Sequence, residues 1–270
     1  AVTEELVSPP EGTIAGSGDA EGYLVDHIND AFTAVNRVLA DGGDAWWYTD
    51  PVRAGSERFD AGAFYLEADR DVIEGLARDK GLDFQAVTSR PSGNAMELEP
   101  VKIGLWDRYG GSMPSGWTRM ILEDFEFDFD VLYPPDLDED DLSEYDVLVF
   151  EDGAIPSEDE EEEGGYRRGG ELDPETVPQE YRERMGDVTV ATTVPRILEF
   201  TRAGGSVIAI GSSAVLAEHA DLPVRNHLVD ETGAPLERDE YFTPGSILRM
   251  KVDHGTPLTH GLEEYEDVLF

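Results

Sequence analysis

Tyr145-Asp-Val-Leu-Val-Phe150 and Ser206-Val-Ile-Ala-Ile210 are two short, near-continuous apolar runs that are rich in valine, isoleucine and leucine. Runs of this length and composition are typical of strands buried in a parallel sheet. Apolar residues at helical spacing over 194–203 precede the second run, and residues 101–106 and 129–133 are further strand-like segments. Strands that alternate with helical segments predict an α/β fold with a parallel sheet and helices on both faces.

Between residues 106 and 129 the pattern predicts a helix. Ser115 is placed to cap it, and it extends to Phe125 with Trp117, Met120, Ile121 and Leu122 on its apolar face.

Residues 151–190 interrupt this pattern, because they form a long, acidic and glycine-rich stretch. We expect a mobile surface insertion there, with a short helix over 178–185. The chain end is more β-like, over 246–252 and 268–270.

The first hundred residues predict a smaller unit. Residues 1–20 show no periodicity and are interpreted as an entry arm, and residues 21–98 contain two successive β-α-β patterns. We expect a small α/β unit with a largely parallel sheet, followed by one larger domain over 99–270. The predicted strands of the small unit are 22–26, 45–48, 63–66 and 84–88, and its helices are 29–39 and 71–80.

The charge balance limits the classes of partner. The 270 residues include 20 basic and 60 acidic side chains, which gives a formal net charge of −40. This charge repels phosphate backbones and anionic lipid, so we expect neither nucleic-acid nor membrane partners, but cations at the acidic surface. Only three of the basic residues are lysines. This composition resembles that of proteins from high-salt organisms; an acidic protein with a basic partner is the alternative.

Other sequence features exclude further classes. The chain has no cysteine, so disulfides, thiolate metal sites and cysteine nucleophiles are excluded. No apolar window of about 18 residues predicts a membrane span. The first residues of this chain lack the basic and apolar regions of a signal peptide.

Ligands of open parallel sheets bind at the carboxyl ends of the strands. The glycine-rich segment 107–119 follows the strand that ends at Trp106, and its backbone amides and a helix N-terminus are suited to an anion or a carboxylate. The alternative is a glycine-rich turn with Trp117 packed in the core. The candidate ligand-binding residues in this crevice are Asp107, Arg108, Ser112, Ser115 and Arg119.

The other two strand ends carry Asp152, in Glu151-Asp-Gly-Ala154, and Gly211-Ser212-Ser213, a sharp strand-to-helix turn. The turn has the shape of a nucleophile elbow but not the GxSxG sequence. His219 lies farther along the same predicted helix and points away, so Ser212 is a weak candidate nucleophile without a base. The ordinary interpretation is a tight turn whose amides cap the helix.

Metal motifs are incomplete. His260-Gly-Leu-Glu263 matches HxxE but has no third ligand. Asp136, Asp138 and Asp140 resemble the start of a calcium loop, but Asp141 and Val147 occupy positions that require glycine and glutamate. We therefore expect no metal or other cofactor in this segment.

Several segments resemble the region downstream of the catalytic domain in large prokaryotic zinc carboxypeptidases. They are residues 100–119, 150–156, 203–213 and 222–226, while 22–98 is similar to the part just before. In that family the later part resembles a class I glutamine amidotransferase-like domain with a flavodoxin-like sheet. Working amidotransferases carry a cysteine on the elbow, and the matching position here is Gly211. The zinc-binding HxxE and distant histidine of the family would lie upstream of Ala1.

The resemblance therefore implies a non-catalytic accessory region, a pseudoenzyme domain, of a secreted or cell-surface zinc-carboxypeptidase-like protein. Its implied partners are the upstream peptidase domain, with zinc only there, and a peptide or small ligand in the 107–119 crevice. An independent hydrolase that uses Ser212, Asp107 or Asp152 is one alternative, and a structural spacer is the other.

Overall fold

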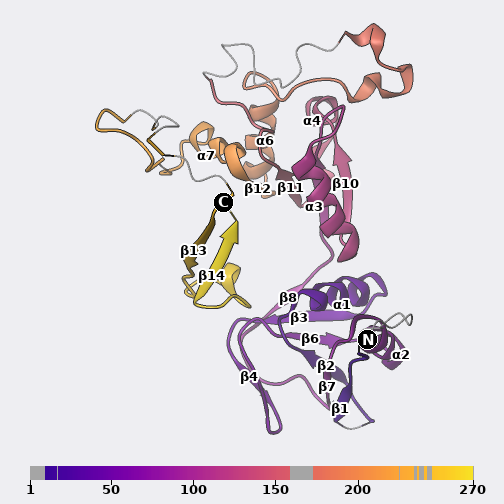
Figure 1. The fold of residues 1–270 in the computed structure, drawn as a ribbon. Coiled ribbons are helices and arrows are strands. Elements are labelled where there is room, and N and C mark those ends of the chain that lie inside the picture. The colour runs from indigo at the N-terminus through magenta and orange to yellow at the C-terminus, as the bar shows by residue number, and fades with distance from the viewer. Residues whose placement is uncertain are drawn as a thin grey trace, which may run out of the picture. The chain divides into compact units, whose positions relative to one another are not determined.

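The structure is a computed structural model that describes residues 10–16, 18–158, 173–224, 226–233, 236, 240–241 and 245–269. The chain forms two compact units, Ala1–Pro100 with Leu236–Phe270, and Val101–Pro235 (Figure 1). The last 35 residues thus group with the first unit, and the segment interpreted as an entry arm contains a strand of that unit's sheet, β1 (Ile14–Gly16).

The first unit contains a six-stranded sheet with the order β1-β7-β2-β6-β3-β8. Only β1 and β7 are parallel, so the prediction of a largely parallel sheet is wrong. Strand β6 lies between β2 and β3, and β2 lies between β6 and β7. The helix after β2 and the helix after β6 therefore each connect two strands that are not neighbours in the sheet. This is the split β-α-β arrangement of the ferredoxin-like fold. The bounds are β1 Ile14–Gly16, β2 Gly22–Val25, α1 Asn29–Ala40, β3 Asp44–Tyr48, β6 Phe64–Glu67, α2 Arg70–Lys80, β7 Phe84–Val87 and β8 Ala95–Leu98.

Each face of this sheet is covered. Val38 of α1 and Ile73 and Leu76 of α2 are fully buried in one cluster with Phe64 and Leu66 of β6. On the other face, the hairpin of β4 (Val52–Ala54) and β5 (Glu57–Phe59) belongs to a second buried cluster. Because side chains alternate between the two faces of a strand, Phe64 and Leu66 of β6 belong to the first cluster and Tyr65 belongs to the second.

The last strands of the chain, β13 (Ile247–Lys251) and β14 (Tyr265–Leu269), form an antiparallel pair. This confirms the β-like end. Between them lies the one-turn helix η5 (Pro257–Thr259). The histidine after it, His260, has its ring 5.3 Å from that of Trp47 in β3.

The second unit confirms the α/β class. Its four strands are all parallel and have the order β10-β9-β11-β12, so the order reverses between β9 and β11. The bounds are β9 Lys102–Trp106, α3 Met113–Asp124, β10 Asp128–Leu132, α4 Pro134–Glu139, η1 Leu142–Glu144, β11 Val147–Phe150, η2 Pro174–Thr176, η3 Gln179–Arg184, α6 Thr193–Arg202, β12 Ser206–Ala209, η4 Gly211–Val215 and α7 Leu216–His219.

Helices lie on both faces of this parallel sheet. Leu122 of α3 packs with Ile103, Leu105 and Val149 on one face. Leu137 of α4 and the α6 residues Val194, Ile197 and Phe200 belong to the buried cluster on the other face. The helix predicted from Ser115 begins earlier, at Met113, because Ser112 rather than Ser115 is the N-cap.

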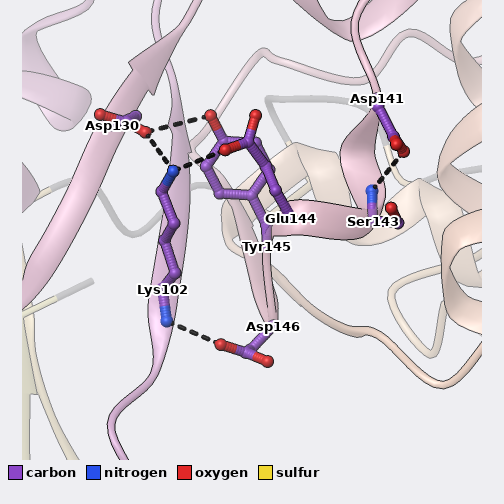
Figure 2. A network of polar contacts seen from close by, with 7 residues as sticks. All are labelled: Lys102, Asp130, Asp141, Ser143, Glu144, Tyr145 and Asp146. Carbon is purple, nitrogen blue, oxygen red and sulfur yellow. Dashed lines mark hydrogen bonds and ion pairs between the residues drawn. The ribbon is translucent and has the colours of Figure 1, made fainter.

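A charged network joins the start of β9 to the middle of β10 and to the segment before β11 (Figure 2). Lys102 Nζ lies 2.7 Å from Glu144 and 3.1 Å from Asp130, while the Lys102 backbone amide donates to Asp146. Hydrogen bonds to Glu144 and Asp130 raise the pKa of Lys102. Burial, followed by Asp130, raises the pKa of Tyr145 to about 12. The network therefore links neighbouring strands of the parallel sheet on the side of the Lys102 end of β9.

The expected mobile insertion is anchored where the structure describes it. In residues 173–190, Val177 and Val188 are buried, and the Arg184 guanidinium lies 5.1 Å from the Tyr133 ring and 5.2 Å from the Tyr181 ring. The short helix expected over 178–185 is confirmed as η3. The remaining part of the predicted insertion, 159–172, lies outside the described residues.

Across the described ranges, the structure contains no helix with the length and apolarity needed to span a bilayer.

Candidate functional site

The turn after β12 has the backbone conformation of an elbow, with a glycine at the bend. Gly211 has a φ of +63°, which favours glycine. A Cβ atom at this position would lie 2.5 Å from Asp152 Oδ1 and 2.9 Å from Asp152 Cβ. The aspartate that follows β11 therefore occupies the space that a side chain at position 211 would need.

Ser212 is held by the same aspartate. Its backbone amide and its hydroxyl each donate to Asp152 Oδ1 at 2.8 Å, and its hydroxyl oxygen accepts from the Gly153 amide at 2.9 Å. The hydroxyl thus has both a donor and an acceptor partner within the turn. This arrangement explains its position as a bridge between the loops after β11 and β12.

Ser213 makes an equivalent bridge in the interior. It is fully buried, accepts from the amides of Ala154 and Ile155 at 3.0 and 3.1 Å, and donates to the Glu151 carbonyl at 2.5 Å. A buried hydroxyl that satisfies two backbone amides stabilises the loop it contacts. The two serines therefore have clear structural roles.

No imidazole stands beside Ser212 in the part of the chain that the structure describes, and its hydroxyl donates instead to the Asp152 carboxylate. His219 lies in α7, and its Nε2 is 2.8 Å from the Pro156 carbonyl oxygen. An Asp–Ser pair without an imidazole lacks the general base of a serine hydrolase triad.

In the 107–119 crevice the chain's own carboxylate takes the backbone amides that an anion would use. Asp107 Oδ1 accepts from the amides of Arg108 and Ser112 at 2.8 and 2.7 Å. The Ser112 hydroxyl accepts from the Ser115 amide at 3.4 Å and caps α3. The carboxylate of Asp107 thus stands where a bound anion was expected.

The two candidate arginines differ in their surroundings. Arg119 pairs with Glu123 at 2.8 Å, one helical turn along α3, and not with a group across the crevice. Arg108 lies in the exposed glycine-rich turn. Hydrogen bonding to Glu123 raises the pKa of Arg119.

A buried polar contact between α3 and β11 was missed by sequence reasoning. Glu151 is 4 % exposed and accepts a hydrogen bond from the Thr118 hydroxyl. Ser115, one turn earlier on the same helix face, is also buried, and its hydroxyl has no hydrogen-bond partner among the described residues. The only sequence signal was the position of Glu151 directly after a buried strand.

The expected apolar face of α3 is largely uncovered. Leu122 is buried, but Met113, Trp117 and Ile121 are 78 %, 59 % and 48 % exposed. Ile208 of β12 is paired with Val149, a member of the cluster beneath α3, so it lies on the same sheet face and is also exposed. The second unit thus exposes large apolar side chains on α3 and along β12, here called the α3–β12 face, and they are Met113, Trp117, Met120, Ile121, Ile208 and Ile210.

Metal ligands do not converge anywhere within the described ranges, where no group of three or more histidine and acidic side chains has the geometry to hold an ion. Asp136, one of the residues that resemble a calcium loop, instead accepts from the Tyr133 amide at the start of α4. His260 and Glu263 both line a cleft in the first unit.

Comparison of the chain with protein-family models, with curated proteins and with solved structures finds no match.

Proposed function

We propose that this chain is a non-catalytic accessory region of a secreted or cell-surface, halophilic zinc-carboxypeptidase-like protein. In this proposal the second unit is a flavodoxin-like, amidotransferase-like domain that has lost its nucleophile. Its strand order, β10-β9-β11-β12, corresponds to the first four strands of the flavodoxin-like order 2-1-3-4-5.

The observation that carries the proposal is the turn at Gly211. The backbone keeps the positive φ of an elbow, but the residue has no side chain and Asp152 fills the space beside it. Ser212 donates to the Asp152 carboxylate and Ser213 to the Glu151 carbonyl, and among the described residues neither hydroxyl has the imidazole base of a serine hydrolase beside it. These contacts support a turn that has become structural.

The exposed α3–β12 face favours an accessory role over a simple spacer. An exposed apolar patch is typical of a site that binds another protein surface, and Met113, Trp117, Met120 and Ile121 share one side of α3. We propose that the peptidase domain of the same protein covers this face. Trp117→Glu should therefore weaken association with that domain, while Leu222→Glu, a matched change at an exposed leucine outside the face, should not.

A turnover assay tests the absence of catalysis. The wild-type chain and Ser212→Ala should release product from nitrophenyl esters, anilides and glutamine at the same background rate. Turnover that Ser212→Ala or Asp152→Ala abolishes in a folded protein would establish the hydrolase alternative.

The coding sequence upstream of Ala1 tests the family assignment separately. The proposal predicts an in-frame HxxE motif followed by a distant histidine, the pattern that supplies zinc ligands in carboxypeptidases. An upstream open reading frame without that pattern would contradict the zinc-carboxypeptidase part of the proposal and leave the non-catalytic part standing.

A further inference from the structure

The edge strand β12 of the parallel sheet carries no charge, although the chain as a whole is strongly acidic. In the order β10-β9-β11-β12 this strand is paired on one side only, with β11. Residues 203–217, which contain the strand and the turn after it, include no acidic or basic side chain, whereas 30 % of the whole chain is charged. Soluble proteins commonly protect an edge strand with charged side chains or proline, and β12 has neither. The strand is therefore open to pairing with another strand.

Other sheet edges of the chain do carry charges. Strand β10, at the opposite edge of the same sheet, contains Asp128 and Asp130, and Asp130 lies 3.1 Å from Lys102. In the first unit the edge strand β8 contains Glu97. Carboxylates at an edge oppose pairing with another acidic strand, because like charges directly opposite one another are destabilising. The lack of charge is thus a particular property of the β12 edge.

The hydrogen bonds of β12 show which of its backbone groups face outward. The amides of Ser206 and Ile210 donate to carbonyl oxygens on the β11 side, each at 2.9 Å. Because backbone groups alternate between the two sides of a strand, the N–H and C=O groups of Val207 and Ala209 point to the free edge. No strand in the described part of the chain pairs with them. Four backbone groups are therefore available to a partner strand.

The side chains and the ends of β12 leave space for that partner. Ile208 and Ile210 are apolar and are 51 % and 41 % exposed. The residues just outside the strand are small, since Gly204-Gly205 precedes it and Gly211 follows Ile210. A strand that paired with this edge would cover part of the two isoleucines without displacing a bulky side chain.

We propose that β12 of a second copy of this chain occupies the edge, so that two four-stranded sheets join into one sheet of eight strands. The two β12 strands run antiparallel about a two-fold axis at Ile208. In this register Val207 of each copy lies opposite Ala209 of the other, and the two pairs exchange four N–H···O=C hydrogen bonds. A second copy supplies an uncharged strand whose outward groups match these four in number and spacing, and all of them become satisfied.

The symmetry agrees with the docking proposed above. A two-fold axis that makes two edge strands antiparallel is perpendicular to the sheet, so the α3–β12 faces of both copies lie on the same side and α3 stays free. Each copy has a net charge of −40, so repulsion opposes the dimer at low salt and is screened at molar KCl. An edge of four residues buries less surface than a stable interface of standard size, so we expect a reversible dimer.

Sedimentation equilibrium of the full chain in molar KCl, from about 1 µM to about 300 µM, tests the proposal. We expect a monomer–dimer equilibrium with a dissociation constant within this range, and weaker association at low salt. Val207→Pro removes an outward N–H group and leaves the bonds to β11 intact, so it should weaken dimerisation by at least about ten-fold. Val131→Pro is the matched control on the opposite edge. The Leu132 carbonyl faces β9, so Val131 faces outward, and its replacement should leave the dissociation constant unchanged.

A cysteine cross-link tests the register. The chain has no cysteine, so each variant carries a single thiol. Opposite residues in a non-hydrogen-bonded antiparallel pair have Cα atoms about 4.5 Å apart, which a disulfide can bridge. Ile208→Cys should therefore give a disulfide-linked dimer under mild oxidation in molar KCl. Ser206→Cys lies two residues from the axis, so its two copies are about 14 Å apart and should not cross-link.

Three results would overturn the proposal. The first is a chain that stays monomeric over the whole concentration range in molar KCl, because the edge would then require a strand from a different protein. The second is a dimer that Val207→Pro does not weaken, or that Val131→Pro weakens equally. The third is a disulfide that forms as readily in Ser206→Cys as in Ile208→Cys. Thermal melts identify any variant that does not fold, and the cysteine pair decides the question if Val207→Pro is one of them.

Discussion

Replacement of Gly211 by alanine probes the close contact between Asp152 and the turn after β12. The left-handed φ of +63° at Gly211 costs a residue with a side chain about 1–2 kcal/mol. The new methyl group would lie 2.5 Å from Asp152 Oδ1, so the carboxylate must move and weaken its two hydrogen bonds from Ser212. At about 0.5–1 kcal/mol for each bond, the free energy of unfolding of the second unit should fall by about 3 kcal/mol in total.

Two controls separate the backbone from the steric contribution. Gly153 also has a positive φ, +78°, but a Cβ there would meet no atom within 4 Å. Gly153→Ala should therefore cost only the backbone contribution, about 1–2 kcal/mol. In an Asp152→Ala background the steric clash is absent, so Gly211→Ala should cost about the same as Gly153→Ala, with a coupling energy of about 1–2 kcal/mol.

The assay is urea unfolding followed by hydrogen exchange of peptides from β11 and β12, because the chain has two units that need not unfold together. Two results would refute the reasoning that Asp152 fills the space beside Gly211. One is a Gly211→Ala cost no larger than that of Gly153→Ala. The other is a Gly211→Ala cost that is as large in the Asp152→Ala background as in the wild type.

Three further predictions concern stability. Ser213→Ala should lower the free energy of unfolding by about 2–4 kcal/mol in urea titrations, because it leaves two buried amides without an acceptor, whereas Ser212→Ala at its exposed position should cost less than about 1.5 kcal/mol; equal costs would contradict the assigned roles. Burial, opposed by the hydrogen bond to Gly62 and reinforced by His260, lowers the pKa of His27 below 6.5. The stability that comes from the neutral form of His27 is therefore present above pH 6.5 and is lost as the pH falls. Between pH 7.5 and pH 5 the melting temperature should fall further for the wild type than for His27→Gln. Parallel curves for the two proteins would contradict this prediction. With a net charge of −40, the melting temperature should rise steeply between low and molar KCl, where the Debye length shrinks to about 3 Å, and a flat profile would contradict the halophilic interpretation.

The parallel sheet of the second unit was predictable because its strands are local, continuous apolar runs. Val147–Phe150 and Ser206–Ala209 pair with each other along their whole length, and both runs are visible in the sequence. In the first unit the elements were also visible, but their pairing was not. The local sequence pattern does not indicate that β2 pairs with β6 and β7 instead of β3. That pairing depends on how α1 and α2 pack together on one face of the sheet.

The sequence predicted which residues follow the parallel strands, but not the hydrogen bonds that these residues make. The carboxyl ends of β9, β11 and β12 do carry Asp107, Asp152 and Ser212, as the sequence indicates. Sequence reasoning assigned free backbone amides to this edge, because it does not show which side chains fold back onto them. Asp107 and Asp152 do so, and each takes amides that a ligand would otherwise use.

The cleft in the first unit was beyond sequence reasoning for a different reason. His27 and His260 are separated by more than two hundred residues; His27 follows a predicted strand without a motif around it, and His260 belongs to an HxxE match that lacks a third ligand. Only the grouping of the chain end with the first unit brings them to the same cleft.

The most direct measurement of the central claim is covalent labelling of the wild-type chain with a fluorophosphonate, read by intact mass. An active serine hydrolase treated in parallel serves as the positive control. The account predicts no mass increase, as for Ser212→Ala, because Ser212 is held by Asp152 and Gly153 and has no imidazole partner. A stoichiometric adduct that maps to Ser212 would contradict it and identify the chain as an enzyme.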